Sequence, residues 1–113
     1  MTQVKHMKWW GWGKDGVGFH FEDKPGFAPF VKYAVGLDLL TATRAGEPSF
    51  DELTVTKSNA KAAFVKALAG IVGDEHVTTD DMDRVIHTYG KSIRDLMRIR
   101  GNMILRSPDV VVY

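Results

Sequence analysis

The sequence predicts a mainly α-helical fold with a minor β component, built as one small unit. Three apolar runs in its second half recur at helical spacing, and each ends near a glycine, where the end of a helix is expected. Strongly β-prone segments are short and few. A length of 113 residues with 44% hydrophobic residues is enough for one modest core and no more.

The first part of the chain is predicted to be largely irregular. Residues 5–21 alternate aromatic residues with glycines, which favours extended pieces and turns over helix. Apolar residues then recur at near-helical spacing from Ala28 to Val35, and Gly36 follows at the capping position, so a short helix is expected there. Residues 37–57 have the composition of a connector, interrupted by Leu53–Val55 as a short strand.

The most regular pattern predicts a helix from Ala60 to Val72. Ser58 is of the residue type that caps helix N-termini, and Gly73 supplies the stop. The apolar residues at helical spacing are Ala60, Ala63, Phe64, Ala67, Leu68, Ile71 and Val72.

Two shorter helices and a strand are predicted after it. Thr78 or Thr79 can cap the first helix, which should end near Gly90. Its opening turn places the negative charges of Asp80, Asp81 and Asp83 at the positive end of the helix dipole. Ser92 can cap the second, Ile93 to Arg100, which Gly101 closes. The strand follows Pro108, in Asp109 to Tyr113.

The predicted organisation has three parts. Residues 1–57 form an aromatic and glycine-rich region with a short helix and connector, residues 58–107 a helical segment, and residues 108–113 the first strand of a further domain. An apolar strand at a chain end, with nothing after it to cover it, leads us to expect that a longer chain has been shortened.

Composition excludes several classes of protein. Fifteen basic and fourteen acidic residues nearly cancel, so bulk charge supports neither nucleic-acid binding nor adhesion to an anionic membrane. The chain has no cysteine, which rules out disulfides and fits a reducing compartment; cytoplasm is the expected location. No apolar run approaches the roughly 20 residues that a membrane span needs.

The segment Gly11 to Gly16 matches the letters of a dinucleotide-binding glycine loop. Such a loop needs a buried strand before it and a helix after it, so that backbone amides point at a pyrophosphate. Lys5–Lys8 does not resemble a core strand, and Val17–Phe21 resembles a strand rather than a helix. We therefore do not expect a Rossmann site.

The tryptophan cluster has three interpretations. Trp9, Trp10 and Trp12 lie close in sequence to Lys5, Lys8 and Lys14. Large aromatic rings bury the most area per residue, which favours packing against the rest of a protein. The same composition also suits peripheral contact with a membrane or, less well, stacking on nucleobases. Packing is favoured, because no basic run extends the patch.

No catalytic, cofactor-binding or metal-binding residue is predicted. His6, His20, His76 and His87 are never three or four residues apart, so no pair shares a helix face for a metal. The aspartates of residues 80–83 lack the glycine and distal glutamate of a calcium loop. No serine lies in a nucleophile elbow.

A basic band is expected across the last two helices. Its members are Arg84, Arg94, Arg98, Arg100 and Arg106, with Lys91. Such a band can contact a phosphate or an acidic partner, but solvated helix faces look the same, and the second interpretation is favoured.

Several stretches resemble one protein family. They are Lys8–Gly13, Val72–Val77 with Thr79 and Asp80, Arg84–Ser92, Leu96–Gly101 and Ser107–Tyr113. Together they resemble the N-terminal region of alkyldihydroxyacetonephosphate synthases and related flavoproteins of the vanillyl-alcohol oxidase type, and they cover nearly the whole chain.

The resemblance implies a scaffold rather than a catalyst. In that family the Pro-Asp-Val-Val strand opens an α+β FAD-binding domain, and the pyrophosphate loop and catalytic residues lie downstream. FAD is therefore expected in the full-length parent and not in this chain, and no functional residue carries over. The parent reaction would exchange the acyl chain of acyl dihydroxyacetone phosphate for a fatty alcohol, in ether-lipid synthesis. A flavin-dependent 2-hydroxy-acid oxidoreductase is the alternative parent.

The expected partner is the rest of the flavoenzyme chain. Two alternatives remain open: a stand-alone interaction or membrane-docking module that uses the tryptophans, and a shortened gene product with no role of its own. The apolar run Val110–Tyr113 further predicts self-association through an uncovered strand edge.

Overall fold

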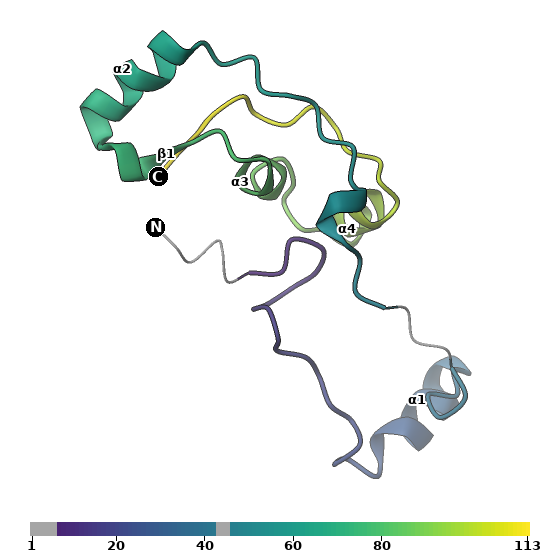
Figure 1. Ribbon diagram of the computed structural model, residues 1–113. Helices are drawn as coiled ribbons and strands as arrows, with labels where there is room; N and C mark the ends of the chain where they lie inside the picture. The colour runs from purple at the N-terminus through teal and green to yellow at the C-terminus, as the bar shows by residue number, and fades with distance from the viewer. Residues whose placement is uncertain (1–6, 43–45) are drawn as a thin grey trace. The chain divides into compact units, whose positions relative to one another are not determined.

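A computed structural model describes residues 7–42 and 46–113 (Figure 1). Over these residues the fold is mostly helical, with four α-helices and one two-stranded antiparallel sheet. The predicted fold class is confirmed. Residues 5 and 6 of the predicted aromatic segment lie outside the described residues.

The chain divides into two compact units. One contains the described residues 7–15 and 48–113, and the other contains residues 16–42 and 46–47. Each unit is described by itself below. The three-part division of the sequence, with its boundaries at residues 57 and 107, stays a prediction.

The smaller unit is built around α1, Phe27–Val35, as predicted. Gly36 takes a left-handed conformation, φ 72°, and its N–H donates to the carbonyl of Lys32, which ends the helix. Phe19 packs edge-on against Phe27 with ring centroids 5.0 Å apart. No residue of α1 is buried.

The predicted strand at Leu53–Val55 is wrong. A short 3-10 helix, η2 (Phe50–Glu52), precedes this segment, which then runs extended without a ladder. The N–H of Thr54 donates to the side-chain carbonyl of Asn102, 2.7 Å away, where a strand would find a neighbouring backbone. A side chain therefore replaces the partner strand.

Helix α2, Ala62–Val72, begins later than predicted. Ser58 does not cap it: its hydroxyl donates to the carbonyl of Asp109 at 2.5 Å and accepts the N–H of Ala60 at 3.1 Å. Lys61 takes the N-cap position without a side-chain hydrogen bond. Gly73, with φ 100°, ends the helix as predicted.

The terminal strand has a partner within the chain. After a 3-10 turn, η3 (Asp74–His76), strand β1 (Val77–Thr78) pairs antiparallel with β2 (Val111–Val112), with Val77 opposite Val112. The N–H of Tyr113 continues the pairing to the carbonyl of His76 at 2.8 Å. One edge of β2 is therefore covered by β1, so the expectation of an uncovered strand is wrong for that edge. Self-association through the opposite edge of β2 stays a prediction.

Helix α3, Asp81–Ile86, is shorter than predicted and has a different cap. Asp80 is the N-cap and accepts the N–H of Met82, while Thr78 accepts the N–H of Asp80 and shapes the approach. The helix ends at Ile86, before Gly90, because the N–H of Thr88 turns to the carbonyl of Val85.

Helix α4, Ile93–Arg100, is confirmed with both of its predicted ends. Ser92 and Asp95 form a reciprocal capping box, in which each side chain accepts a hydrogen bond from the other's backbone N–H.

The core of the larger unit is small. Its buried apolar residues are Trp9, Val85, Leu96, Ile99 and Val111. Three polar residues are buried with them, Asp83, Arg84 and Ser107. Buried polar groups of this kind need partners, so they are the first place to look for a site.

Candidate functional site

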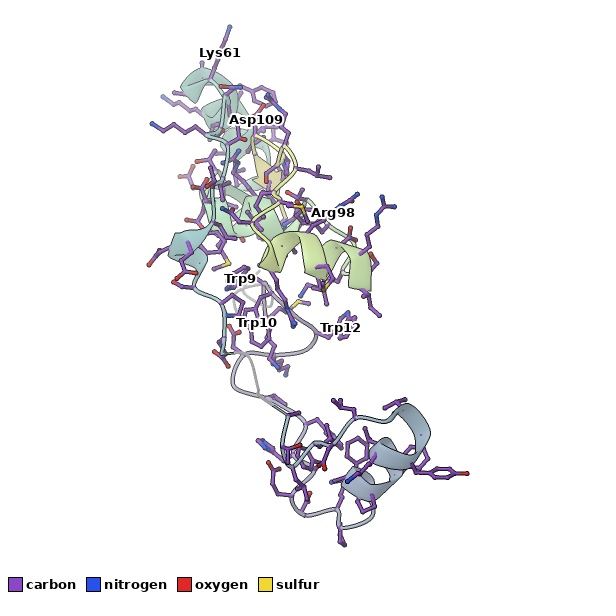
Figure 2. All side chains as sticks on the ribbon, turned by 90° about the vertical axis from the view of Figure 1, so that its right-hand side faces the viewer. Trp9, Trp10, Trp12, Lys61, Arg98 and Asp109 are labelled. Atoms are coloured by element: carbon purple, nitrogen blue, oxygen red, sulfur yellow. The ribbon has the colours of Figure 1, made fainter. Side chains whose placement is uncertain are left out.

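The tryptophan loop, residues 8–13, is fastened to the α3–α4 connection and to α4 (Figure 2). The Lys91 ammonium donates to the carbonyls of Lys8 and Gly11, at 2.6 and 3.2 Å. The indole N–H of Trp12 donates to the carbonyl of Lys91 at 2.8 Å, and Nε of Arg100 donates to the carbonyl of Trp10 at 3.0 Å. The two cations are therefore used to hold backbone carbonyls.

The three tryptophans have different environments. Trp9 is buried and packs edge-on against Phe50, with centroids 5.3 Å apart, in line with the favoured packing interpretation. The Trp10 ring has the Lys8 ammonium 5.3 Å and the Arg100 guanidinium 5.2 Å from its centroid. Trp12 remains 58% exposed.

Lys91 is held under strain and partly out of water. Its backbone is left-handed, with φ 60°, a conformation that is uncommon outside glycine. Desolvation lowers the pKa of its ammonium, and the charge of Asp15 opposes that shift. The carbonyl contacts offset these costs, so Lys91 acts as a structural cation.

Arg84 is the centre of the buried polar cluster, and only 1% of its surface is exposed. Its guanidinium donates to the carbonyl of Pro108 at 2.7 Å, to the carbonyl of Thr56 at 2.7 Å and to the carboxylate of Asp81 at 2.6 Å. One side chain thus joins the connector, α3 and the segment that leads into β2.

Asp83 fixes the end of β2 onto α3. Its two carboxylate oxygens accept hydrogen bonds from the hydroxyls of Tyr113, at 2.5 Å, and Thr78, at 3.3 Å. The pKa of the Tyr113 phenol is raised above its ordinary range, mainly by burial and secondly by its hydrogen bond to Asp83. The His87 ring lies edge-on to Tyr113 at 5.4 Å.

The grouping of Asp83, Tyr113 and His87 resembles an acid–base site only in its residue types. Both oxygens of the carboxylate are occupied, and the raised pKa keeps the phenol protonated. The Nδ1 atom of His87 lies 2.7 Å from the carbonyl of Asp83 in its own helix. The arrangement locks β2 onto α3, and the Nδ1 side of the His87 ring faces its own helix.

The predicted basic band does not exist as one surface. Arg84 is buried, while Lys91 and Arg100 bind the tryptophan loop. Arg98 lies 4.0 Å from Asp95 and Arg106 lies 3.4 Å from Asp109, each on its own turn. Sequence reasoning missed the burial of Asp83 and Arg84; the only local signal was the i, i+3 spacing of Asp81 and Arg84, which pair in the structure.

The described residues do not fit FAD. The Gly11–Gly16 segment follows an isolated bridge at Met7 rather than a parallel strand, and no helix begins until Phe27. Within this segment the carbonyl of Gly11 accepts a hydrogen bond from the Lys91 ammonium. A hollow of about 450 Å³ beside α2 is lined by three alanines with Val65, Lys66, Asp74 and Thr79, and none of these lining residues is a glycine that could cradle a pyrophosphate.

Over the described ranges, no group of three or more His, Cys, Asp or Glu residues is placed to hold a metal ion. No helix there is long and apolar enough to cross a membrane.

The geometry thus defines a small helical fold whose buried polar groups bond to backbone carbonyls and side chains of the same unit. No protein-family model matches the chain. Protein Rv2250A of Mycobacterium tuberculosis (strain ATCC 25618 / H37Rv) is 33% identical over 108 residues, which cover 94% of this chain and 68% of that protein. The chain belongs to the family of this protein.

The chain is also related to part of the alkyldihydroxyacetonephosphate synthases, which are FAD-dependent. The synthase of Dictyostelium discoideum is 37% identical over 49 residues, and that of Trypanosoma brucei brucei is 38% identical over 52 residues. These matches cover 43% and 46% of this chain, but only 8% of each synthase.

Solved synthase structures share the fold of nearly the whole chain. Two alkyldihydroxyacetonephosphate synthase structures match 99% of the chain with TM-scores of 0.77 and 0.78, at 22% sequence identity. The chain spans 25% and 23% of those synthase chains. The resemblance inferred from the sequence is confirmed as a partial similarity.

Proposed function

We propose that this chain is a non-catalytic scaffold that packs against the FAD-binding domain of an alkyldihydroxyacetonephosphate synthase-like enzyme. One observation carries the proposal: 99% of the chain has the fold of about a quarter of a synthase chain. The polar side chains that could have made a site are engaged with the chain's own backbone. FAD and the catalytic residues then belong to the domain that this scaffold supports.

The distribution of apolar side chains supports a scaffold role. No residue is buried in either α1 or α2, although both helices are rich in apolar residues. Contiguous exposed apolar surface of this kind marks a face that another protein surface covers. The ether-lipid branch is favoured over a 2-hydroxy-acid oxidoreductase, because the named enzymes that match are synthases. A chain without cysteine suits the cytoplasm.

The test is whether this chain is found together with flavin. The natural gene is tagged at its N-terminus, and the product is purified under native conditions from its own cells. We expect visible flavin absorption, and FAD released on heating, in proportion to the tagged chain. The assay works whether the FAD-binding domain follows on the same polypeptide or is a separate protein. A tagged product that is pure, folded and colourless refutes the proposal.

A second candidate, peripheral membrane docking, is favoured by the 58% exposure of Trp12. An exposed indole prefers the headgroup region of a bilayer. The test is co-sedimentation with neutral and anionic liposomes, comparing the wild type with Trp12→Ala. Phe30→Ala is the matched control, because Phe30 is an aromatic residue of similar exposure, 62%, in the other unit. If the wild type does not sediment with liposomes, membrane docking is excluded.

A further inference from the structure

Helix α2 is the least explained element of the larger unit. It has the sequence AAFVKALAGIV, with Lys66 as its single charged residue, and none of its residues is buried. A helix that is apolar around most of its circumference is normally found in the interior of a protein. The described chain covers only part of this surface.

The covered and open faces of α2 can be separated. The half-buried residues Val65, Leu68, Ala69 and Val72 fall on one side when successive residues are rotated by 100°. Phe64 and Ile71 lie outside that side, roughly 90° and 110° around the helix from its centre, and are 54% and 80% exposed. Ala63, Ala67 and Gly70, also exposed, form a row of small side chains next to them. We call Phe64, Ala67, Gly70 and Ile71 the outer face.

Helix α2 needs more support than this unit gives it. Helices shorter than roughly 12–15 residues are marginal in water, and packing supplies most of their stability in proteins. α2 has 11 residues and no side-chain N-cap hydrogen bond. The open side of the helix is therefore where further packing would stabilise it.

Gly70 gives an independent sign of a close neighbour. Glycine within a helix is unfavourable, and proteins keep it there where another backbone must approach. A Cβ atom built on Gly70 would meet no other atom within 4 Å in this structure. Nothing in the described chain therefore requires a glycine at this position, whereas a partner lying close against the outer face would.

We propose that the outer face of α2 is where the flavin-binding domain packs, an inference that rests on the proposed function. The lengths of the matching synthases support this occupant. Tyr113 is bonded to His76, in the turn that directly follows α2, and Figure 1 shows the C-terminus beside β1 near the end of α2. In the matching solved synthases, about three quarters of the chain lies outside the matched region.

The chemistry of the outer face fits an apolar protein surface. The four residues carry no charge or hydrogen-bonding side chain, so they offer nothing to a phosphate or a sugar. Small side chains beside the ridge formed by Phe64 and Ile71 suit a helix that packs closely.

The experiment compares variants of the natural, tagged gene product by the amount of FAD recovered per tagged chain. Ile71→Glu places a charge in the centre of the outer face, and we expect at least about a tenfold loss of recovered FAD. Lys66→Glu is the control, because Lys66 lies about 140° around the same helix from Ile71, and it should stay within about twofold of the wild type. Gly70→Ala should lower FAD recovery while raising the unfolding midpoint of the 113-residue chain, because alanine favours helix.

The outcomes separate this inference from the proposed function. If the wild-type product carries no FAD, the proposed function fails, and this inference fails with it. If the wild type carries FAD and Ile71→Glu retains it, only the location on α2 is overturned. Light scattering on the 113-residue chain tests the other occupant: a dimer that Ile71→Glu dissociates would assign the outer face to a second copy and overturn the inference. A chain that unfolds with Ile71→Glu is replaced by Ile71→Ser, judged by the same criteria.

Discussion

Replacement of Arg84 by methionine gives the sharpest test of what holds the larger unit together. Methionine keeps a long apolar side chain in the buried position and removes the three hydrogen-bond donations. The Asp81 side chain is 53% exposed, so water can hydrate its carboxylate once the arginine is gone. Loss of that ion pair therefore lowers the free energy of unfolding only slightly. The carbonyls of Thr56 and Pro108 lose a charged donor in a partly buried place, at about 1–1.5 kcal/mol each. We therefore expect a loss of about 2–3 kcal/mol in the free energy of unfolding.

Urea denaturation followed by far-UV circular dichroism measures this loss. With a slope of about 1.5 kcal/mol per molar urea, the midpoint should fall by about 1.3–2 M. Arg84→Lys should lie between the wild type and Arg84→Met, because one ammonium cannot reach three acceptors in different directions. Arg94→Met is the matched control, since Arg94 is exposed on α4 and its loss should change stability by less than about 0.5 kcal/mol.

The result that would refute this reasoning is equally definite. If Arg84→Met loses no more than the Arg94→Met control, the buried guanidinium gains no more from its carbonyl contacts than its desolvation costs. A gain in stability would show that an apolar side chain serves this position better than the arginine.

Three further predictions concern the other anchors of the same unit. The pKa of Tyr113 is raised in the folded state, so the stability that its phenol contributes is full below pH 10.0, its ordinary value, and falls above it. Tyr113→Phe should flatten this alkaline loss in circular dichroism, and an unchanged profile would contradict the bond to Asp83. The pKa of Asp109 is lowered by the N–H of Asn59, so its contribution is present above pH 3.8 and lost as pH falls through the folded-state value. Asp109→Asn should remove that acid dependence, as measured by urea midpoints across the acidic range. Lys91→Met should release the tryptophan loop, at a cost of about 1–2 kcal/mol, and shift tryptophan emission to the red; emission at the wild-type wavelength would count against the anchoring role.

Elements with local signals were predicted well from the sequence. Helix α4 carries its own start and stop, in Ser92 with Asp95 and in Gly101. Helix α1 ends at Gly36 for the same reason. In each case the residues that define the element lie within one turn of it, so the sequence window contains the whole argument.

Three of the errors share one physical cause, which is competition from partners distant in sequence. Ser58 was a good cap by type, but its hydroxyl binds the carbonyl of Asp109, 51 residues away. In the segment predicted as a strand, the N–H of Thr54 donates to the side-chain carbonyl of Asn102, 48 residues away. The terminal strand pairs with residues 33 to 35 positions earlier in the chain, since Val77 lies opposite Val112 and Thr78 lies opposite Val111. No local pattern shows which distant group competes best.

The candidate site was less predictable than the fold. An arginine within a short helix normally points to solvent, and no sequence pattern distinguishes Arg84 from Arg94. Hydrogen bonds to backbone carbonyls offset the cost of burying Arg84. Backbone carbonyls are chemically the same at every residue. A sequence therefore cannot mark them as partners, whereas it can mark an oppositely charged side chain.

In the larger unit, several cationic side chains face inward while large apolar side chains of α2 face outward, and both observations have one explanation. Arg84, Lys91 and Arg100 turn inward onto backbone carbonyls, while Phe64 and Ile71 of α2 remain open. The inward cations join segments that a small core of five buried apolar residues would hold only weakly. The open apolar residues add nothing to the stability of the unit alone, but they contribute once a second surface covers them. A segment that belongs beside a larger domain should divide its side chains in this way, because binding to that domain adds to the free energy of unfolding by mass action.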